Sequence, residues 1–230
     1  MAIAFVCDFD GTVSPSDIGA AFVNRFRDGG DDELASALAR WRAGEIGHRE
    51  LTEIECSALR ASAADADAFA RGFALDPEFA PFVSSALAAG HRVAVVSEGF
   101  DFYIADRLAN AGLAHVPWSS NRVRFEGTRV IPEFPHAGRG CGRCGNCKGE
   151  RVRDEQLEGR TVVFVGDGLS DRCGARAADR VFARGALLAW CEREGIAATR
   201  FDDFADVARG TGLAGAPTNG ASRHRHGGGA

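Results

Sequence analysis

Short apolar runs alternate with helical periodicities along the chain, and together they predict a parallel sheet interrupted by a helical insert. Three runs rich in β-branched residues, 2–6, 92–96 and 161–165, are typical of buried parallel strands. Each run ends abruptly in polar residues or glycine. Because open α/β sheets bind their ligands at the carboxyl ends of the strands, we expect the functional site at that edge.

The segment between the first two runs has the periodicity of helices. A fourth helix is predicted over 66–75, and another over 82–89 leads into the second strand. This insert, placed directly after the first strand, predicts a small cap over the crevice. Apolar residues recur at helical spacing in three successive sets, Ile18, Phe22 and Phe26, then Leu34, Leu38 and Trp41, then Leu51, Ile54 and Ala58.

The remaining chain contains weaker signals. We expect a hairpin over 122–131 beside the sheet, one more strand over 180–183 and a helix over 187–194. Residues 213–230 are rich in Gly, Ala, Ser and Thr without an apolar period, which favours a disordered tail.

These patterns predict an α/β fold, a Rossmann-like parallel sheet core with a small helical cap inserted after the first strand. The predicted core covers 1–14 and 78–212, the cap covers 15–77, and 213–230 form the tail. At 230 residues, the chain is long enough for one full domain and a smaller insert.

Composition and charge narrow the possible partners. A hydrophobic fraction of 45% and a charged fraction of 26% are ordinary for a globular protein and exclude a fibrous or wholly disordered chain. The net charge of -5 provides no general basic field, so we expect neither nucleic acid nor a membrane as partner. With no apolar run near ~20 residues and no cationic start, we expect a cytoplasmic protein. We expect a monomer or homodimer as its oligomeric state.

Two carboxylates, Asp8 and Asp10, leave the first predicted strand just before the turn at Gly11. This pair suits covalent phosphoryl transfer, because one carboxylate can attack phosphorus while the other serves as general acid and base. A solvated turn is the alternative interpretation of an isolated Asp-x-Asp.

Two further carboxylates, Asp167 and Asp171, follow the third predicted strand within a glycine-flanked segment. Their oxygen ligands suit a hard cation such as Mg²⁺. A carboxylate that attacks a phosphate needs such positive charge nearby, because the two anions repel each other.

A phosphate site is predicted from one lysine and one serine. Lys148 is the single lysine among 27 basic residues, and a compact ammonium cannot be exchanged for a guanidinium on a phosphate. Ser97, followed by the backbone N–H groups of Glu98 and Gly99, can donate hydrogen bonds to the other phosphate oxygens.

In this order, residues 8–12, Ser97, Lys148 and 166–171 resemble the four motifs of the haloacid dehalogenase superfamily of phosphohydrolases. The resemblance covers residues 2–205, and the helical insert lies where the phosphoserine-phosphatase-like branch carries its cap.

The resemblance implies specific roles. Asp8 would be the nucleophile and Asp10 the general acid and base. Mg²⁺ would lie on Asp8, the main-chain carbonyl of Asp10 and Asp167, supported by Asp171, while Ser97 and Lys148 would bind the phosphate.

A narrower likeness concerns the segments 97–103, 144–148 and 182–188. They resemble the methionine-salvage branch, which dephosphorylates 2-hydroxy-3-keto-5-methylthiopentenyl-1-phosphate. Phosphoserine phosphatase is the sister interpretation. Glu98 departs from that branch, which usually has glycine after the motif serine; its carboxylate either points away from the phosphate or marks a different substrate.

Three residues of the predicted cap are candidate substrate contacts. Asp17 either faces the substrate or is simply a carboxylate at a helix N-terminus, where the macrodipole favours it. His48 and Arg49 are expected at the solvated surface.

The chain contains seven cysteines, an odd number that argues against a disulfide framework. Cys141, Cys144 and Cys147, at three-residue spacing, either bind Zn²⁺ with His136 as fourth ligand or are free thiols. Bound zinc would hold the loop that delivers Lys148. The other four are expected to pack in the core or on helices, namely Cys7, Cys56, Cys173 and Cys191.

The function predicted is a Mg²⁺-dependent phosphomonoesterase that acts through an aspartyl-phosphate, and we expect a small phosphorylated metabolite as its ligand. The methionine-salvage enol phosphate and phosphoserine are the candidate substrates. A phosphosugar mutase would share the same core, and a receiver-like switch would not need the cap. A metal-binding or redox module built on residues 141–147 is the alternative from another class.

Overall fold

The computed structural model describes residues 2–213. Its centre is a sheet of seven strands in the order β4-β3-β2-β1-β5-β6-β7, in which neighbours pair in parallel except for the antiparallel pair β3 and β4. This confirms the predicted α/β class. The strands are β1 (Ile3–Cys7), β2 (Arg92–Phe100), β3 (Trp118–Glu126), β4 (Arg129–Glu133), β5 (Thr161–Gly166), β6 (Arg180–Ala183) and β7 (Thr199–Arg200).

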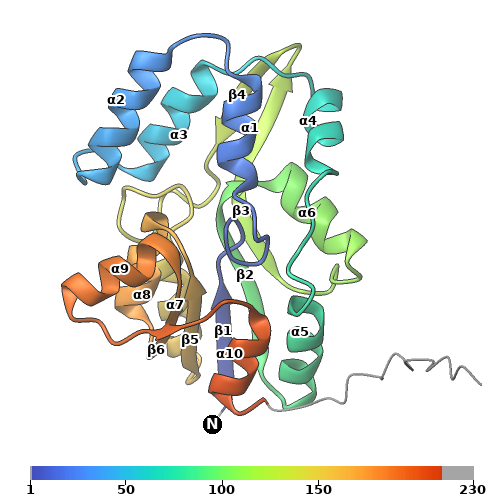
Figure 1. Cartoon of the computed structure of the whole chain (residues 1–230), viewed down its shortest axis with the longest axis vertical. Helices are drawn as coiled ribbons and strands as arrows, with labels where there is room; N and C mark the ends of the chain where they lie inside the picture. The colour runs from blue at the N-terminus through green and yellow to red at the C-terminus, as the bar shows by residue number, and fades with distance from the viewer. Residues whose placement is uncertain (1, 214–230) are drawn as a thin grey trace, which may run out of the picture.

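Helices cover both faces of the sheet and its carboxyl edge (Figure 1). α5, α6 and α10 lie on one side of the strands, and α7, α8 and α9 lie on the other. The core helices are α5 (Phe79–Ala88), α6 (Asp101–Asn110), α7 (Lys148–Leu157), α8 (Arg172–Ala177), α9 (Gly185–Glu194) and α10 (Phe204–Thr211).

The central strand β1 is buried on both faces, which explains its uninterrupted apolar sequence. Phe5 packs with Phe82 of α5 in one layer of the core, where their ring centroids lie 4.9 Å apart. Ala4 and Val6 point to the opposite layer, which contains Val152 of α7. The alternation of side chains along a strand therefore supplies both layers from one run.

The segment after β1 forms four helices beyond the carboxyl ends of the strands. Part of this cap has a small apolar cluster of its own, in which Ile46 and Leu51 are buried. The limits of cap and core stay a prediction. The cap helices are α1 (Ile18–Phe26), α2 (Asp31–Arg42), α3 (His48–Ser57) and α4 (Ala63–Ala70).

Several element boundaries differ from the prediction, and the differences at α4 and β2 have a local structural cause. α4 begins three residues earlier than expected because Ser62 and Asp65 form a capping box, and it ends at Ala70 shortly before Gly72. β2 continues through Ser97 to Phe100, and its pairing with β3 shifts register between Val96 and Phe100. Ser97 therefore lies at an irregular point of the strand rather than after its end.

The predicted hairpin is the antiparallel pair β3 and β4 at the edge of the sheet, and its tip reaches the cap. The N–H of Ala61 donates to the carbonyl of Thr128 over 2.9 Å, and the backbones of Arg60 and Arg129 form an isolated antiparallel β-bridge. The cap is therefore attached to the core by the hairpin as well as by its own two ends.

The predicted tail falls almost entirely outside the described residues, because 214–230 are not among them. Within 2–213, no helix is both long and apolar enough to cross a membrane.

Candidate active site

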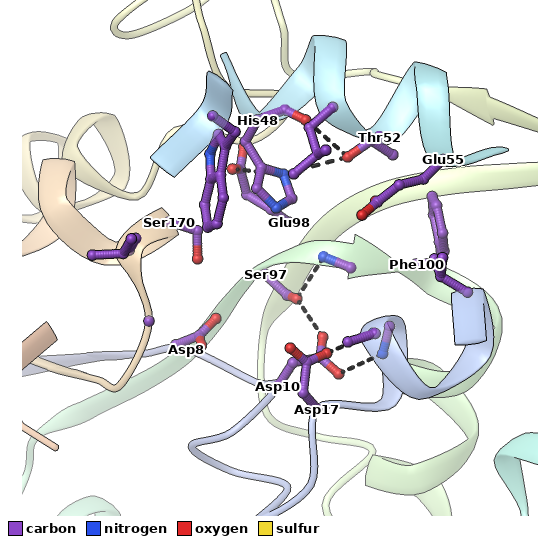
Figure 2. A pocket seen from close by; sticks show the side chains of 18 of the residues that line it. Asp8, Asp10, Asp17, His48, Thr52, Glu55, Ser97, Glu98, Phe100 and Ser170 are labelled. Atoms are coloured by element: carbon purple, nitrogen blue, oxygen red, sulfur yellow. Dashed lines mark hydrogen bonds and ion pairs between the residues drawn. The ribbon is translucent and has the colours of Figure 1, made fainter. Parts of the chain in front are cut away.

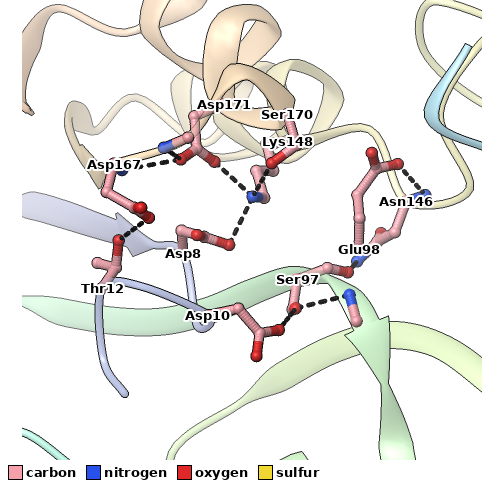
Figure 3. Close-up of polar contacts among 12 residues, drawn as sticks. Asp8, Asp10, Thr12, Ser97, Glu98, Asn146, Lys148, Asp167, Ser170 and Asp171 are labelled. Carbon is pink, nitrogen blue, oxygen red and sulfur yellow. Dashed lines mark hydrogen bonds and ion pairs between the residues drawn. The ribbon is translucent and has the colours of Figure 1, made fainter. Parts of the chain in front are cut away.

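The four predicted motifs meet at the carboxyl edge of the sheet (Figure 3). Asp8 follows β1, Ser97 lies in β2, Asp167 follows β5, and Lys148 is the first residue of α7. Parallel strands bring residues distant in sequence to one edge, so the crevice lies where the sequence places it.

Lys148 joins two of the carboxylates in the buried floor of the site. Its side chain is 1% exposed, and Nζ donates to Asp8 Oδ1 over 2.5 Å and also to Asp171 Oδ1. Burial acts to lower the pKa of Lys148, but Asp171 and Asp8 raise it above its usual range. The ammonium is therefore held in its charged form beside Asp8.

Three carboxylates form a cluster in which one oxygen of each lies within 4.8 Å of the others, namely Asp8, Asp167 and Asp171. Burial and the nearby Asp171 raise the pKa of Asp8 above its usual range and that of Asp167 to about 6. A divalent cation would relieve this crowding of negative charge, and oxygen ligands of this kind suit Mg²⁺.

Hydrogen bonds hold the acidic cluster in place. The Thr12 hydroxyl donates to Asp167 Oδ1 over 2.9 Å, and Asp171 Oδ2 accepts the N–H groups of Asp167 and Gly168, each over 2.9 Å. Gly11 is required beside them, because its φ is 76° and a Cβ there would collide with the Asp167 carboxylate.

The carboxylate of Asp10 points away from the acidic cluster toward the start of the cap (Figure 2). It accepts hydrogen bonds from the N–H of Ile18 over 2.9 Å and from the Tyr103 hydroxyl over 2.7 Å. Burial and the neighbouring Asp17 raise the pKa of Asp10 to about 7. A carboxyl group of this kind can both give and take a proton near neutral pH, and only its main-chain carbonyl is left for a metal.

Ser97 and Gly99 lie beside Asp10. Ser97 Oγ accepts the N–H of Gly99 over 2.9 Å and donates to Asp10 Oδ2 over 3.4 Å. A Cβ at position 99 would collide with the Tyr103 hydroxyl, so only glycine allows Tyr103 to reach Asp10.

The Glu98 carboxylate is engaged away from the phosphate-binding groups. It accepts the N–H of Asn146 over 3.2 Å and pairs with His48 Nδ1 over 3.1 Å. The Glu98 carboxylate therefore points away from Ser97 and Lys148 (Figure 3). Glu98 also lines the cavity, so its effect on the choice of substrate stays a prediction. The expectation for His48 was wrong: its side chain is 20% exposed and links the cap to the core.

A cavity of about 190 Å³ lies between the cap and the carboxyl edge of the sheet (Figure 2). Its cap side combines polar side chains with an apolar wall, and no arginine within residues 2–213 lines it. Asp17 both lines the cavity and caps α1, where it accepts the Ala20 N–H over 2.7 Å. The apolar lining includes Val23, Leu38, Trp41, Leu51 and Phe100, and the polar lining of the cap includes Asp17, His48, Thr52 and Glu55.

The Glu55 carboxyl group makes the stability of the fold depend on pH. Burial and the nearby Asp17 raise its pKa to about 7 from an ordinary 4.5. Between these pH values the folded chain holds a proton that the unfolded chain has lost, so stability falls as pH rises toward 7.

We expect Glu55→Gln to melt a few degrees above the wild type at pH 8, with the difference vanishing near pH 4. Thermal unfolding across this pH range measures it, with the exposed Glu53→Gln, on the same helix, as control. A difference that does not change with pH would contradict the shifted pKa.

Residues missed in the sequence include Thr12, Tyr103 and Asn146, which contact the motif residues. One signal was present: Tyr103 is the single tyrosine in the chain, just as Lys148 is the single lysine. Thr12 and Asn146 lie within segments 8–12 and 144–148, which carry the resemblance, but neither could be assigned a role of its own from the sequence.

The cysteines of residues 141–147 lie beside Cys173, and not beside the predicted His136. Cys141, Cys144 and Cys147 lie together, and Cys173 of α8 joins them. His136 instead lies against Arg151, with Nδ1 2.9 Å from a guanidinium nitrogen. Cys7, Cys56 and Cys191 are buried, as expected.

The fold and this site define a class of protein. The family described as haloacid dehalogenase-like hydrolase matches residues 5–176, and the chain belongs to that family. With relatives named as phosphatases over most of its length, it is a phosphatase of the family.

The relatives are bacterial proteins of similar length or longer. One from Brevibacillus brevis, named 2-hydroxy-3-keto-5-methylthiopentenyl-1-phosphate phosphatase, is 30% identical over 213 residues and covers 90% of this chain and 94% of its own. A protein from Bacillus licheniformis named bifunctional enzyme MtnB/MtnX is 31% identical over 89% of this chain and 48% of its own.

Solved structures share the fold. A phospho-aspartyl intermediate analogue of phosphoserine phosphatase has a TM-score of 0.68 at 18% identity, covering 91% of this chain and 98% of that one. A substrate-bound phosphoserine phosphatase complex has a TM-score of 0.67 at 16% identity, with the same coverage.

Proposed function

We propose that this phosphatase hydrolyses a small phosphomonoester with Mg²⁺ through a phosphorylated Asp8, and that the substrate is 2-hydroxy-3-keto-5-methylthiopentenyl-1-phosphate. The observation that carries the mechanism is the position of Asp8. It lies beside the Lys148 ammonium and within a cluster of carboxylates, at the floor of a cavity that the cap covers.

The first step is attack of an Asp8 oxygen on phosphorus, which forms the acyl phosphate as the bond to the leaving oxygen breaks. Lys148 places positive charge on the transferring group, and Ser97 can donate a hydrogen bond to it. Asp10, with its pKa raised to about 7, gives its proton to the leaving oxygen.

In the second step, Asp10 takes a proton from water, which attacks phosphorus, releases inorganic phosphate and regenerates the Asp8 carboxylate. When held by Asp8, Asp167 and the main-chain carbonyl of Asp10, Mg²⁺ supplies charge that offsets the repulsion between carboxylate and phosphate. Asp171 would support this site by holding the loop at Asp167.

The cap side of the cavity supports the choice of substrate. A methylthio group can pack on the apolar surface of Leu38, Trp41 and Leu51. Phosphoserine has an ammonium that Asp17 or Glu55 could accept, but it also brings a carboxylate, for which the lining of the described cavity offers no arginine. The names of the relatives agree with the first substrate.

Phosphate release from a panel of substrates tests this proposal. The panel contains the methylthio-pentenyl phosphate, phosphoserine and simple sugar phosphates, each with Mg²⁺ or with a chelator. We expect the first to have the highest kcat/KM and its turnover to stop when Mg²⁺ is removed. Preference for phosphoserine would contradict the substrate, and full turnover in chelator would contradict the metal.

We expect Lys148→Arg to lower kcat/KM by roughly 100-fold, because a displacement of about 1 Å at a reacting group has effects of this size. Because Lys148 is 1% exposed, the larger guanidinium would have to displace packed neighbours, so the melting temperature should also fall. Steady-state kinetics and thermal unfolding measure both, with the exposed Arg153→Lys on the same helix as the reverse exchange. Full activity in Lys148→Arg would show that charge alone is required.

A further inference from the structure

We propose that Cys141, Cys144, Cys147 and Cys173 form a structural Zn²⁺ site outside the catalytic centre. One ligand atom from each lies within 4.8 Å of the others. Three come from the loop before α7, and the fourth comes from α8, 26 positions after Cys147 in the sequence. The function of the enzyme does not account for this convergence of four thiols.

The spacing of the sulfurs fits tetrahedral coordination. Zinc–sulfur bonds of about 2.3 Å in a tetrahedron put the sulfurs about 3.8 Å apart. Cys141 Sγ and Cys144 Sγ lie 3.4 Å apart, and the remaining distances are under 4.8 Å. Each of the four is a free cysteine, so none is already used in a disulfide.

The loop is shaped to bring its thiols together. Gly140 and Gly142 have φ values of 79° and 73°, which let the chain turn sharply on both sides of Cys141. A Cβ at Gly140 would lie 2.7 Å from Cys147 Sγ, so the glycine leaves the space that this sulfur occupies. Any larger residue at position 140 would displace a ligand.

The ligand set indicates zinc in a structural role. Four thiolates are a closed set that leaves no coordination position for substrate or water, as in structural zinc sites. Soft sulfur ligands disfavour Mg²⁺. The carboxylates of Asp8, Asp167 and Asp171 are the ligands that suit Mg²⁺. The chain would thus hold two different metals at separate sites.

The position of the thiols connects this site with the catalytic groups. Cys147 immediately precedes Lys148, and Cys173 comes two residues after Asp171. Bound zinc would tie the start of α7 to the start of α8, and so hold the lysine against the carboxylate with which it pairs. Zinc would act on phosphate binding by positioning, without touching substrate.

Metal analysis of the purified full chain tests the proposal. Produced with zinc in the medium and purified without chelator, the wild type should contain about one zinc per chain. Cys144→Ser and Cys173→Ser should each reduce the zinc content to background. Cys191→Ala, which removes a buried thiol outside the cluster, and His136→Ala should retain it.

A second measurement does not depend on the folding of variants. Titration of the wild type with an organomercurial thiol reagent should release zinc in step with the modification of about four thiols. Cobalt substituted for zinc should give the thiolate-to-metal absorption of a tetrahedral sulfur site.

Wild-type protein without zinc, with reduced thiols or with a disulfide in the cluster, would overturn the proposal. Loss of zinc in His136→Ala but not in Cys173→Ser would also overturn it, because His136 and not Cys173 would then be the fourth ligand. Zinc content is measured without turnover, so a wrong substrate assignment leaves this test unaffected.

Discussion

Asp8→Asn should release no measurable phosphate from any substrate of the wild type, a loss of more than about 10⁴-fold in kcat. The amide cannot form an acyl phosphate, although it fits the space of the carboxylate. The buried Lys148 would keep its ion pair with Asp171, so we expect the fold to remain. Phosphate release with a sensitive detection assay, together with circular dichroism, measures both.

The exposed Asp32→Asn on α2 is the matched control, because it removes the same charge far from Lys148. It should retain full activity. A wild-type rate in Asp8→Asn would show that Asp8 is not the nucleophile. The phosphorylated side chain would then have to be another residue.

Asp10→Asn should lower kcat by about 10²–10⁴-fold, the range expected when a general acid and base is removed. The surrounding hydrogen bonds can persist, since the amide oxygen still accepts from the Ile18 N–H. The loss should depend on the leaving group, because the phenolate released from an aryl phosphate with an acidic phenol can depart without protonation.

Rapid mixing of Asp10→Asn with such an aryl phosphate should therefore show a burst of about one phenol per enzyme before slow turnover. The burst reports attack by Asp8, and the slow phase reports the missing base. Tyr103→Phe, which removes only a hydrogen bond to Asp10, should lose less activity. An equal loss for all leaving groups without a burst would contradict the role of Asp10.

The fold could be predicted where a segment is buried in a regular way. β1 and β5 are covered on both faces and read as continuous apolar runs, while β6 was predicted with its observed bounds. α7 was not predicted, because its sequence is highly polar and only one large apolar side chain, Val152, is buried in it. β7 has two exposed residues and leaves no pattern to detect.

The site could be predicted to the extent that parallel topology determines it. Strand ends at one edge bring Asp8 and Asp167 together. Lys148 could be singled out because it is the only lysine in the sequence. Contacts between cap and core could not be predicted, because periodicity gives the buried face of a helix but not its partner. The Glu98–His48 pair and the arrival of Cys173 at the cysteine loop depend on that missing information.

The hairpin that joins β3 and β4 limits how this enzyme can acquire a new specificity. Its tip pairs with the cap at Ala61 and Thr128, which lie 67 positions apart in the sequence. Cap and hairpin therefore have to be exchanged together. A chimaera that receives only a foreign cap would keep a hairpin shaped for the old one. Recombination between relatives should therefore preserve activity when both segments come from the same parent.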